Sequence, residues 1–258
     1  KIFMRACLIT PSIVLRAKPY GESDKIVSFL TEMHGKITGI AKGAKRSRRR
    51  FVNSLEPFSL VNLRFYERPQ GNLVFILSSD LLFSFPKLVT GLDRISFASY
   101  LVEITDGLVG EGQEDRLVFQ HLKNGLRYLN ESDVSLRFLT SFELKLLNLV
   151  GYQPVLDRCK RCAKDRRDHP SSRWHFSPRD GGILCETCSR LRKETLPLGA
   201  AAVEVLTDLQ AKDSSTPARR SLPSSVVSEI RSVVMRFIQY HMEREIKSAP
   251  FLYRFASI

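Results

Sequence analysis

The chain has 258 residues, of which 43% are hydrophobic, and it carries 40 Lys and Arg against 27 Asp and Glu, for a net charge of +13. This composition is sufficient for a folded core and excludes a disordered or fibrous protein. No apolar run approaches the roughly 18–20 residues of a membrane-spanning helix, and residues 1–5 show no secretory pattern, so we expect a cytoplasmic protein without a membrane partner.

The positive charge is concentrated in two segments. Residues 1–80 hold 14 basic and 6 acidic side chains, and residues 158–194 hold 11 and 5, whereas the rest of the chain holds 15 and 16. Charge that serves only solubility tends to be spread along a chain. The concentration therefore favours a polyanionic partner such as nucleic acid.

The first 82 residues are predicted to form a β domain. Residues 12–16 predict a strand, and residues 26–30 predict either a strand or a short helix. Gly35, Gly39 and Gly43 suggest sharp bends or bulges in the next strand. Several short, bent strands within about 80 residues are typical of a small barrel or sandwich.

The densest basic cluster of the chain follows these strands. Six of the nine residues in the segment 42–50 are cationic: Lys42, Lys45, Arg46, Arg48, Arg49 and Arg50. Like charges packed so closely repel one another unless an anion is present, and the Arg fork suits phosphate. We predict an exposed loop that binds DNA phosphates, and the alternative is a solvated or flexible loop.

A hairpin is predicted after the basic segment. Val61, Leu63 and Phe65 alternate with more polar residues, and the apolar run 73–77 follows turn-forming residues at 69–72. Most aromatic rings in such a domain belong to its core. Tyr66, on the polar phase of its strand, is the best candidate for stacking on a nucleic-acid base, and Phe51, beside the arginines, is the second.

Residues 83–156 predict helices with three apolar stripes, which we assign to packing. The stripes comprise Ile95, Ala98, Leu101, Val102, Leu108 and Val109; Val118, Leu122, Leu126 and Leu129; and Leu139, Phe142, Leu146 and Leu149. Glu111, Glu114 and Asp115 are interpreted as part of a solvated loop rather than as a two-metal nuclease site. Glu22 and Asp24 are interpreted as a turn or a strand-to-helix cap.

Four cysteines form two close pairs, Cys159 with Cys162 and Cys185 with Cys188, separated by 22 residues. Each two-residue gap lets both thiolates of a pair reach one ion, and two pairs complete a tetrahedron. Disulfides are the weaker alternative in a chain expected to remain in the cytoplasm. We therefore predict a structural Zn²⁺ in a module spanning residues 157–192.

Other residues near the cysteines receive secondary interpretations. His169 and His175 are predicted to be bystanders, because four thiolates already satisfy the ion. Gly181 and Gly182 fit a tight turn before Cys185. The basic residues Lys160, Arg161, Lys164, Arg166 and Arg167 either touch phosphate or belong to a solvated loop; the sequence leaves both interpretations open.

The last region, residues 193–258, completes the helical domain that begins at residue 83. A helix is predicted over 201–211, a linker over 212–217, and a long helix from Pro223 with one face formed by Val227, Ile230, Val234, Phe237 and His241. The chain contains no Walker-type, zinc-protease or nucleophile-elbow motif. We therefore predict no catalytic residue and no enzymatic activity.

Several stretches resemble the RecO family of bacterial DNA repair proteins. They are VLRAKPYGESD at 14–24, TEMHGK at 31–36, GIAKGAK at 39–45, LEPFSL at 55–60, LVGYQPVLDRCKRC at 149–162 and GGILC at 181–185. The resemblance implies an N-terminal OB-fold, a helical domain and an embedded zinc module, which together make an α+β multidomain protein. It is weak in the C-terminal helices.

The resemblance also implies a function. Members of this family bind single- and double-stranded DNA, anneal complementary strands, act with RecR, engage the single-strand DNA-binding protein and help load the RecA recombinase. A nucleoid-associated location follows from these partners. Two other functions are kept open: a zinc-knuckle RNA-binding factor, and a nucleic-acid enzyme stapled by zinc.

Overall fold

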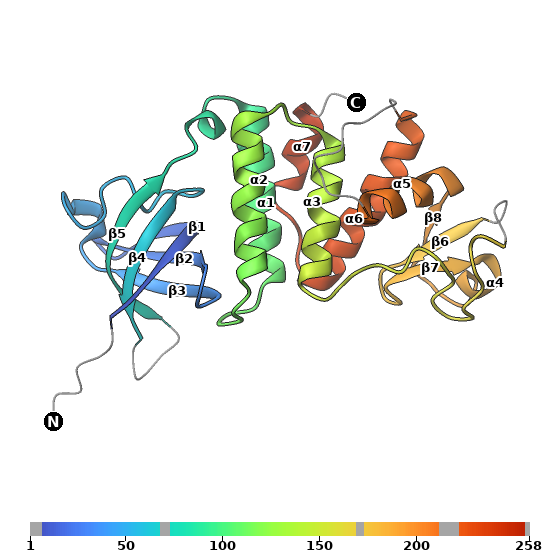
Figure 1. The fold of residues 1–258 in the computed structure, drawn as a ribbon, viewed down its shortest axis with the longest axis horizontal. Coiled ribbons are helices and arrows are strands. Elements are labelled where there is room, and N and C mark those ends of the chain that lie inside the picture. Colours follow the sequence, from blue (N-terminus) through green and yellow to red (C-terminus); the bar gives the residue numbers. More distant parts are fainter. Residues whose placement is uncertain (1–6, 68–72, 169–172, 212–221, 256–258) are drawn as a thin grey trace. The chain divides into compact units, whose positions relative to one another are not determined.

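Five strands of the N-terminal region close into a barrel (Figure 1). The computed structural model describes residues 7–67, 73–168, 173–211 and 222–255. Residues 253, 254 and 255 are described by their backbone alone. The strands are β1 (Leu8–Tyr20), β2 (Asp24–Thr31), β3 (Lys36–Ala41), β4 (Leu60–Tyr66) and β5 (Val74–Phe83). Their order, β1-β2-β3-β5-β4 with β1 also paired to β4, confirms the predicted OB-fold barrel.

The barrel closes because one long strand serves two partners. The first half of β1 pairs with β4 and the second half with β2, and the register shifts between Val14 and Arg16 where the strand bends. On the other side, β3 and β5 run parallel, with Gly39 opposite Val74. A Cβ atom on Gly39 would lie 2.7 Å from Val74 Cγ2, so this glycine permits the close approach of two strands.

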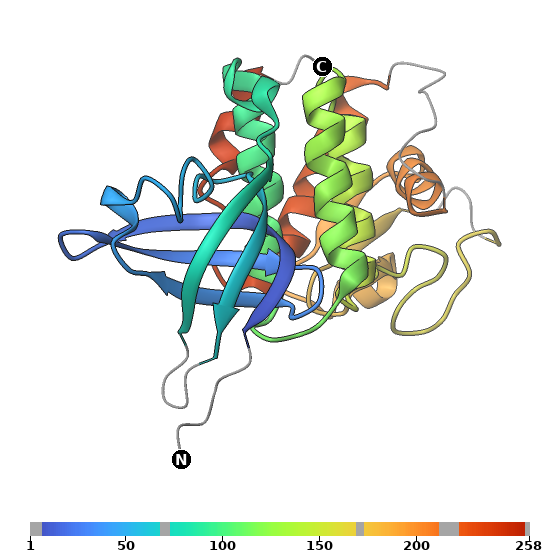
Figure 2. The same ribbon diagram turned by 60° about the vertical axis from the view of Figure 1, so that its left-hand side comes forward.

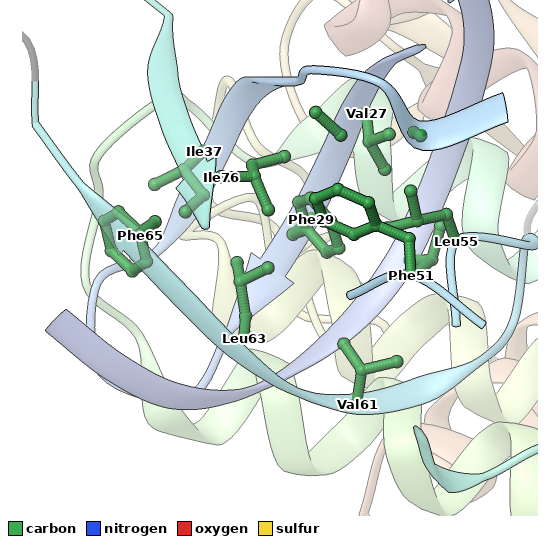
Figure 3. Close-up of a cluster of buried hydrophobic side chains, with 12 residues drawn as sticks. Val27, Phe29, Ile37, Phe51, Leu55, Val61, Leu63, Phe65 and Ile76 are labelled. Carbon is green, nitrogen blue, oxygen red and sulfur yellow. The ribbon is translucent and has the colours of Figure 1, made fainter. Parts of the chain in front are cut away.

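The barrel interior is apolar (Figure 3). As predicted, Val61, Leu63 and Phe65 point inward from β4. Residues 26–30 form part of β2, which resolves the choice between strand and helix. The pairing of β4 with β5 confirms the hairpin, while the turn proposed at Pro69, Gln70, Gly71 and Asn72 lies outside the described residues.

The chain divides into two compact units, of which the first comprises residues 1–133 and 248–252. Besides the barrel, this unit contains α1 (Leu92–Leu108) and α2 (Arg116–Glu131), preceded by the short helix η2 (Pro86–Val89). Asp115 caps α2 by accepting from the backbone N–H groups of Leu117 and Val118. Residues 111–114 are exposed, as expected of a solvated loop, whereas the capping role of Asp115 was not predicted.

The loop before α2 is attached to the barrel. The Gly112 N–H donates to the Lys36 carbonyl over 2.8 Å, and Lys36 Nζ lies 3.5 Å from Asp106 Oδ1. A Cβ atom on Gly35 would meet the Gln113 carbonyl oxygen at 2.3 Å. These contacts fasten the turn between β2 and β3 to the helical hairpin within the same unit.

The second unit comprises residues 134–247 and 253–258. Its elements are α3 (Leu136–Leu149), β6 (Trp174–Ser177), β7 (Gly182–Cys185), α4 (Glu186–Ser189), β8 (Leu196–Leu198), α5 (Ala200–Ala211) and α6 (Ser224–Met242), while α7 (Ala249–Phe255) spans the boundary. The strands form a sheet in the order β7-β6-β8. Glu143 on α3 and Arg231 on α6 form a buried ion pair, with Arg231 Nη2 3.0 Å from Glu143 Oε1.

The helices agree with the sequence pattern in their positions. The predicted apolar stripe of α2 is fully buried, and α5 and α6 occupy the predicted segments. The linker at 212–217 lies outside the described residues. Within the described part of the chain, no helix combines the length and the apolar character needed to cross a membrane.

Substitution of Gly39 by Ala tests the closure of the barrel. The added methyl group must displace Val74 or Ile76, so we expect the free energy of unfolding to fall by about 1–3 kcal/mol. Urea denaturation followed by circular dichroism measures this change. Gly110→Ala is the matched control, because its Cβ would meet only the Gln113 side chain, at 3.6 Å, and should leave stability nearly unchanged. Equal effects of the two substitutions would contradict this account of closure.

Candidate metal centre and nucleic-acid interface

The four paired cysteines come together in the second unit. Cys159 and Cys162 lie in the loop before β6, Cys185 ends β7, and Cys188 lies in α4. The four Sγ atoms are all within 4.8 Å of one another, and the Sγ atoms of Cys162 and Cys185 are 3.7 Å apart. A metal ion could be held by a group of three or more His, Cys, Asp or Glu side chains. Among the described residues, these four cysteines form the one such group.

Backbone contacts hold the first cysteine pair in place. The N–H of Cys159 donates to the Lys164 carbonyl over 2.8 Å, and the N–H of Lys160 donates to the Ile183 carbonyl over 2.8 Å, which ties this loop to β7. Gly181 has φ +72° and forms the predicted turn. Gly182 lies in β7, where a Cβ atom would meet the Val155 carbonyl oxygen at 2.5 Å.

The electrostatics of the thiols differ from one position to the next. Burial opposes the ionisation of Cys159, but backbone N–H groups from Cys162, Cys185 and Arg161 outweigh it and lower its pKa to about 6. Burial and the neighbouring thiols raise the pKa of Cys188 to about 12, and burial raises that of Cys185. A cation at the centre of such a cluster favours the thiolate form of every ligand.

The donor set fits a tetrahedral metal ion. Zn–S bonds of about 2.3 Å place tetrahedral sulfur atoms roughly 3.8 Å apart, close to the separation of the Cys162 and Cys185 sulfurs. His175 lies on β6 and is not part of the cluster. His169 lies outside the described residues, so its predicted role as a bystander is untested.

The basic segment 42–50 belongs to the long connection between β3 and β4, in the barrel unit. It contains one turn of 3-10 helix, η1 (Ala44–Arg46). All six cationic side chains are exposed: Lys42, Lys45, Arg46, Arg48, Arg49 and Arg50. Figure 2 shows this connection at the end of the barrel that the hairpin of β1 and β2 also reaches.

The connection is anchored by apolar side chains that enter the barrel. Phe51 and Leu55 are 5% and 2% exposed, and Figure 3 shows that both side chains lie beside Phe29 of β2. The suggestion that Phe51 stacks on a base is therefore wrong, because its ring is part of the core. Tyr66 remains partly exposed and stacks on Phe75, with ring centroids 5.0 Å apart.

One residue that the sequence did not mark as functional joins the basic segment to the barrel. Asp24, at the start of β2, accepts hydrogen bonds from the Gly43 N–H over 2.8 Å and from Ser23 Oγ over 3.0 Å. The sequence correctly predicted a turn around this residue. It gave no indication of the contact with Gly43, which is 19 positions away.

Comparisons with known proteins agree with the order of these elements. Residues 4–85 match the family described as Recombination protein O N terminal, and residues 90–250 match Recombination protein O C terminal. The DNA repair protein RecO of Syntrophus aciditrophicus is 33% identical over 250 residues, which cover 96% of each chain.

Two further relatives match over nearly as much of their length. The DNA repair protein RecO of Anaeromyxobacter dehalogenans is 34% identical over 93% of both chains, and that of a Thermoanaerobacter species is 30% identical over 95% of this chain and 96% of its own. These matches agree with the OB-type barrel, the helical region and the four-cysteine cluster. Together they define a DNA recombination and repair protein. The chain belongs to the RecO family.

The burial of Phe51 generates a prediction. Phe51→Ala should lower the free energy of unfolding by about 3–5 kcal/mol, because it empties part of the barrel core. Phe51→Leu, which keeps most of the apolar volume, should cost less than about 1.5 kcal/mol and leave the affinity for an oligonucleotide unchanged. Urea denaturation and fluorescence anisotropy measure the two effects. A several-fold loss of affinity in a stable Phe51→Leu protein would mean that the ring contacts a base after all.

Proposed function

We propose that this protein binds single- and double-stranded DNA through the basic segment 42–50 and anneals complementary strands as a recombination mediator. The observation that carries the proposal is the exposure of six cations on an ordered connection of an OB-type barrel. In the described part of the chain, the side chains of Arg46, Arg48 and Arg49 have no hydrogen-bond or ion-pair partner, so their guanidinium groups are available to phosphate.

The surface around the segment extends the positive region. Arg16 and Lys18 are exposed on β1 and lie on the same side of the strand as Tyr20, which is 53% exposed. Lys45 reaches the turn that follows Tyr20, since its Nζ donates to the Gly21 carbonyl over 2.7 Å. Phosphate contacts of this kind give affinity with little dependence on sequence, which suits a mediator that acts on many DNA sequences.

The mechanism requires charge neutralisation and no bond breaking. Two DNA strands repel each other through their phosphates, and cations held at fixed positions on one surface reduce this repulsion. Base pairing then supplies the free energy of annealing. The family relationship supports RecR, the single-strand DNA-binding protein and, indirectly, the RecA filament as partners at the bacterial nucleoid.

The four-cysteine cluster is proposed to bind a structural Zn²⁺. Four thiolates leave no open coordination position for a water molecule or substrate, so the ion would stabilise the module and take no part in catalysis. The ligands would be Cys159, Cys162, Cys185 and Cys188. The sheet that they support contains strands of only three or four residues, which is too little structure to fold without a cross-link.

The basic-segment proposal is tested by the triple variant Arg46→Ala, Arg48→Ala and Arg49→Ala. We expect weaker binding to a fluorescent oligo(dT) at every salt concentration, and a salt slope reduced by about 2 units, because each lost phosphate contact removes about 0.7 unit for a single strand. Strand annealing should slow in parallel. Fluorescence anisotropy across a salt series measures affinity and slope together.

The matched control removes the same charge elsewhere. Arg127, Lys145 and Lys247 are exposed and lie outside both basic segments, so their combined replacement by Ala should leave the affinity nearly unchanged. If the two triple variants bind alike, the segment 42–50 is only a solvated run of charge. A preference for RNA over DNA of equal length would instead favour an RNA-binding factor.

The zinc proposal is tested with the natural fluorescence of the protein. Trp174 is the single tryptophan, is 1% exposed and pairs with Cys185 across β6 and β7. We expect one zinc ion per chain, and chelation or Cys159→Ser should remove it and shift Trp174 emission to longer wavelength. Cys7→Ser, at the exposed cysteine of the barrel unit, should keep the ion. A Cys159→Ser protein that retains its zinc and its Trp174 spectrum would contradict the assignment.

A further inference from the structure

We infer that Asp24 is a positioning residue for DNA binding, and that it holds the basic segment in the conformation that presents Arg46, Arg48 and Arg49 to a phosphate backbone. This inference rests on the proposed DNA-binding function. An acidic residue beneath a cationic surface repels phosphate, so it weakens binding unless it has another role. The contacts of Asp24 supply that role.

The first step of the argument is the anchor itself. Asp24 Oδ1 accepts the Gly43 N–H at the point where Gly43, with φ +68°, turns the chain from β3 into η1. A second contact has the same direction, since the Lys45 N–H donates to the Ser23 carbonyl over 2.9 Å. The turn between β1 and β2 and the start of the basic segment are therefore joined by two backbone donors.

The second step is that two of the six cationic side chains stabilise the conformation of the basic segment. Lys45 Nζ donates to the Gly21 carbonyl, and Arg50 Nη2 donates to the Lys42 carbonyl over 2.8 Å while its guanidinium lies 5.0 Å from the centre of the Phe51 ring. The backbone of Arg50 is tied to β5, because the Ser79 N–H donates to its carbonyl over 2.9 Å.

The third step identifies the cations that remain for phosphate. With Lys45 and Arg50 engaged by backbone carbonyls, the side chains that project without a partner in the described structure include Arg46, Arg48 and Arg49. The Gly43 N–H, followed by the Ser23 hydroxyl and the charges of Lys42 and Lys45, keeps the pKa of Asp24 below its usual value despite some burial. The carboxylate is thus ionised when DNA binds.

Charge and position make opposite predictions for the loss of this carboxylate. Electrostatics alone requires tighter DNA binding when any nearby negative charge is removed. Loss of the anchor requires weaker binding, because the three arginines must then be ordered when DNA arrives. Glu22 provides the comparison, since it is exposed in the same turn and its side chain forms no hydrogen bond or ion pair with the described residues.

The experiment compares Asp24→Ala, Asp24→Asn and Glu22→Ala with the wild-type protein in oligo(dT) anisotropy across a salt series. Glu22→Ala and Asp24→Asn, which keeps an acceptor oxygen for Gly43, should bind as tightly as wild type or slightly tighter. Asp24→Ala should bind about 5-fold or more weakly, the loss expected for one charge-assisted hydrogen bond to the backbone. Its salt slope should stay within about one unit of wild type, because all six cations remain.

Two further measurements keep the outcome clear. Gly43→Ala disturbs the same anchor from the other side, since its left-handed φ disfavours Ala, and it should weaken binding in the same way. Limited trypsin digestion should cut Asp24→Ala faster within 42–50 than Glu22→Ala, at unchanged melting temperature. If Asp24→Ala binds as tightly as Glu22→Ala, Asp24 has no positioning role. If the Arg46, Arg48 and Arg49 triple variant binds like wild type, the basic segment is not the DNA-binding surface, and Asp24 cannot position it for DNA.

Discussion

Closure of the barrel at Gly39 is the constraint on which the rest of the N-terminal unit depends. Only a residue without a side chain lets β3 and β5 meet, and their meeting forces the chain between β3 and β4 to cross the end of the barrel. That crossing must cover an apolar interior, which Phe51 and Leu55 do. The basic residues just before them are consequently held on an ordered surface and kept away from the core.

The four-cysteine cluster lies in the second unit, beside a sheet with a small core of its own. The sheet of β6, β7 and β8 buries Trp174, Phe176, Ile183 and Leu184, which is a small apolar core for a separate module. The four sulfur atoms lie within 4.8 Å of one another, and the proposed ion bound to them would cross-link this core. In the first unit, Phe51 and Leu55 fix the position of the basic segment; in the second, the proposed ion would fix the position of the short strands.

The sequence predicted the fold well where the pattern is local. Alternation in β4, the stripes of the helices and the paired cysteines depend on spacings of two to seven residues, and the structure agrees with them. The resemblance supplied the OB-type barrel, which periodicity alone left as a barrel or a sandwich. Phe51 was misjudged because its neighbours in sequence are arginines, whereas its neighbours in space are Phe29 and Leu55.

The contacts that the sequence could not predict are those between distant segments. Asp24 and Gly43 are joined across the barrel end, and Gly39 acts through Val74, which is 35 positions away in the printed sequence. Such pairs leave no periodic signal, since each consists of one residue facing one other. They become visible only after the topology has brought their strands together.

The buried pair of Glu143 and Arg231 has a consequence for how this sequence changes over generations. Both side chains are at most 3% exposed, and loss of either partner alone strands a charge in the helical core at a cost of about 3–5 kcal/mol. Replacement of both by apolar residues of similar volume carries no such penalty. Substitution at position 143 or 231 therefore costs least stability when both residues change together.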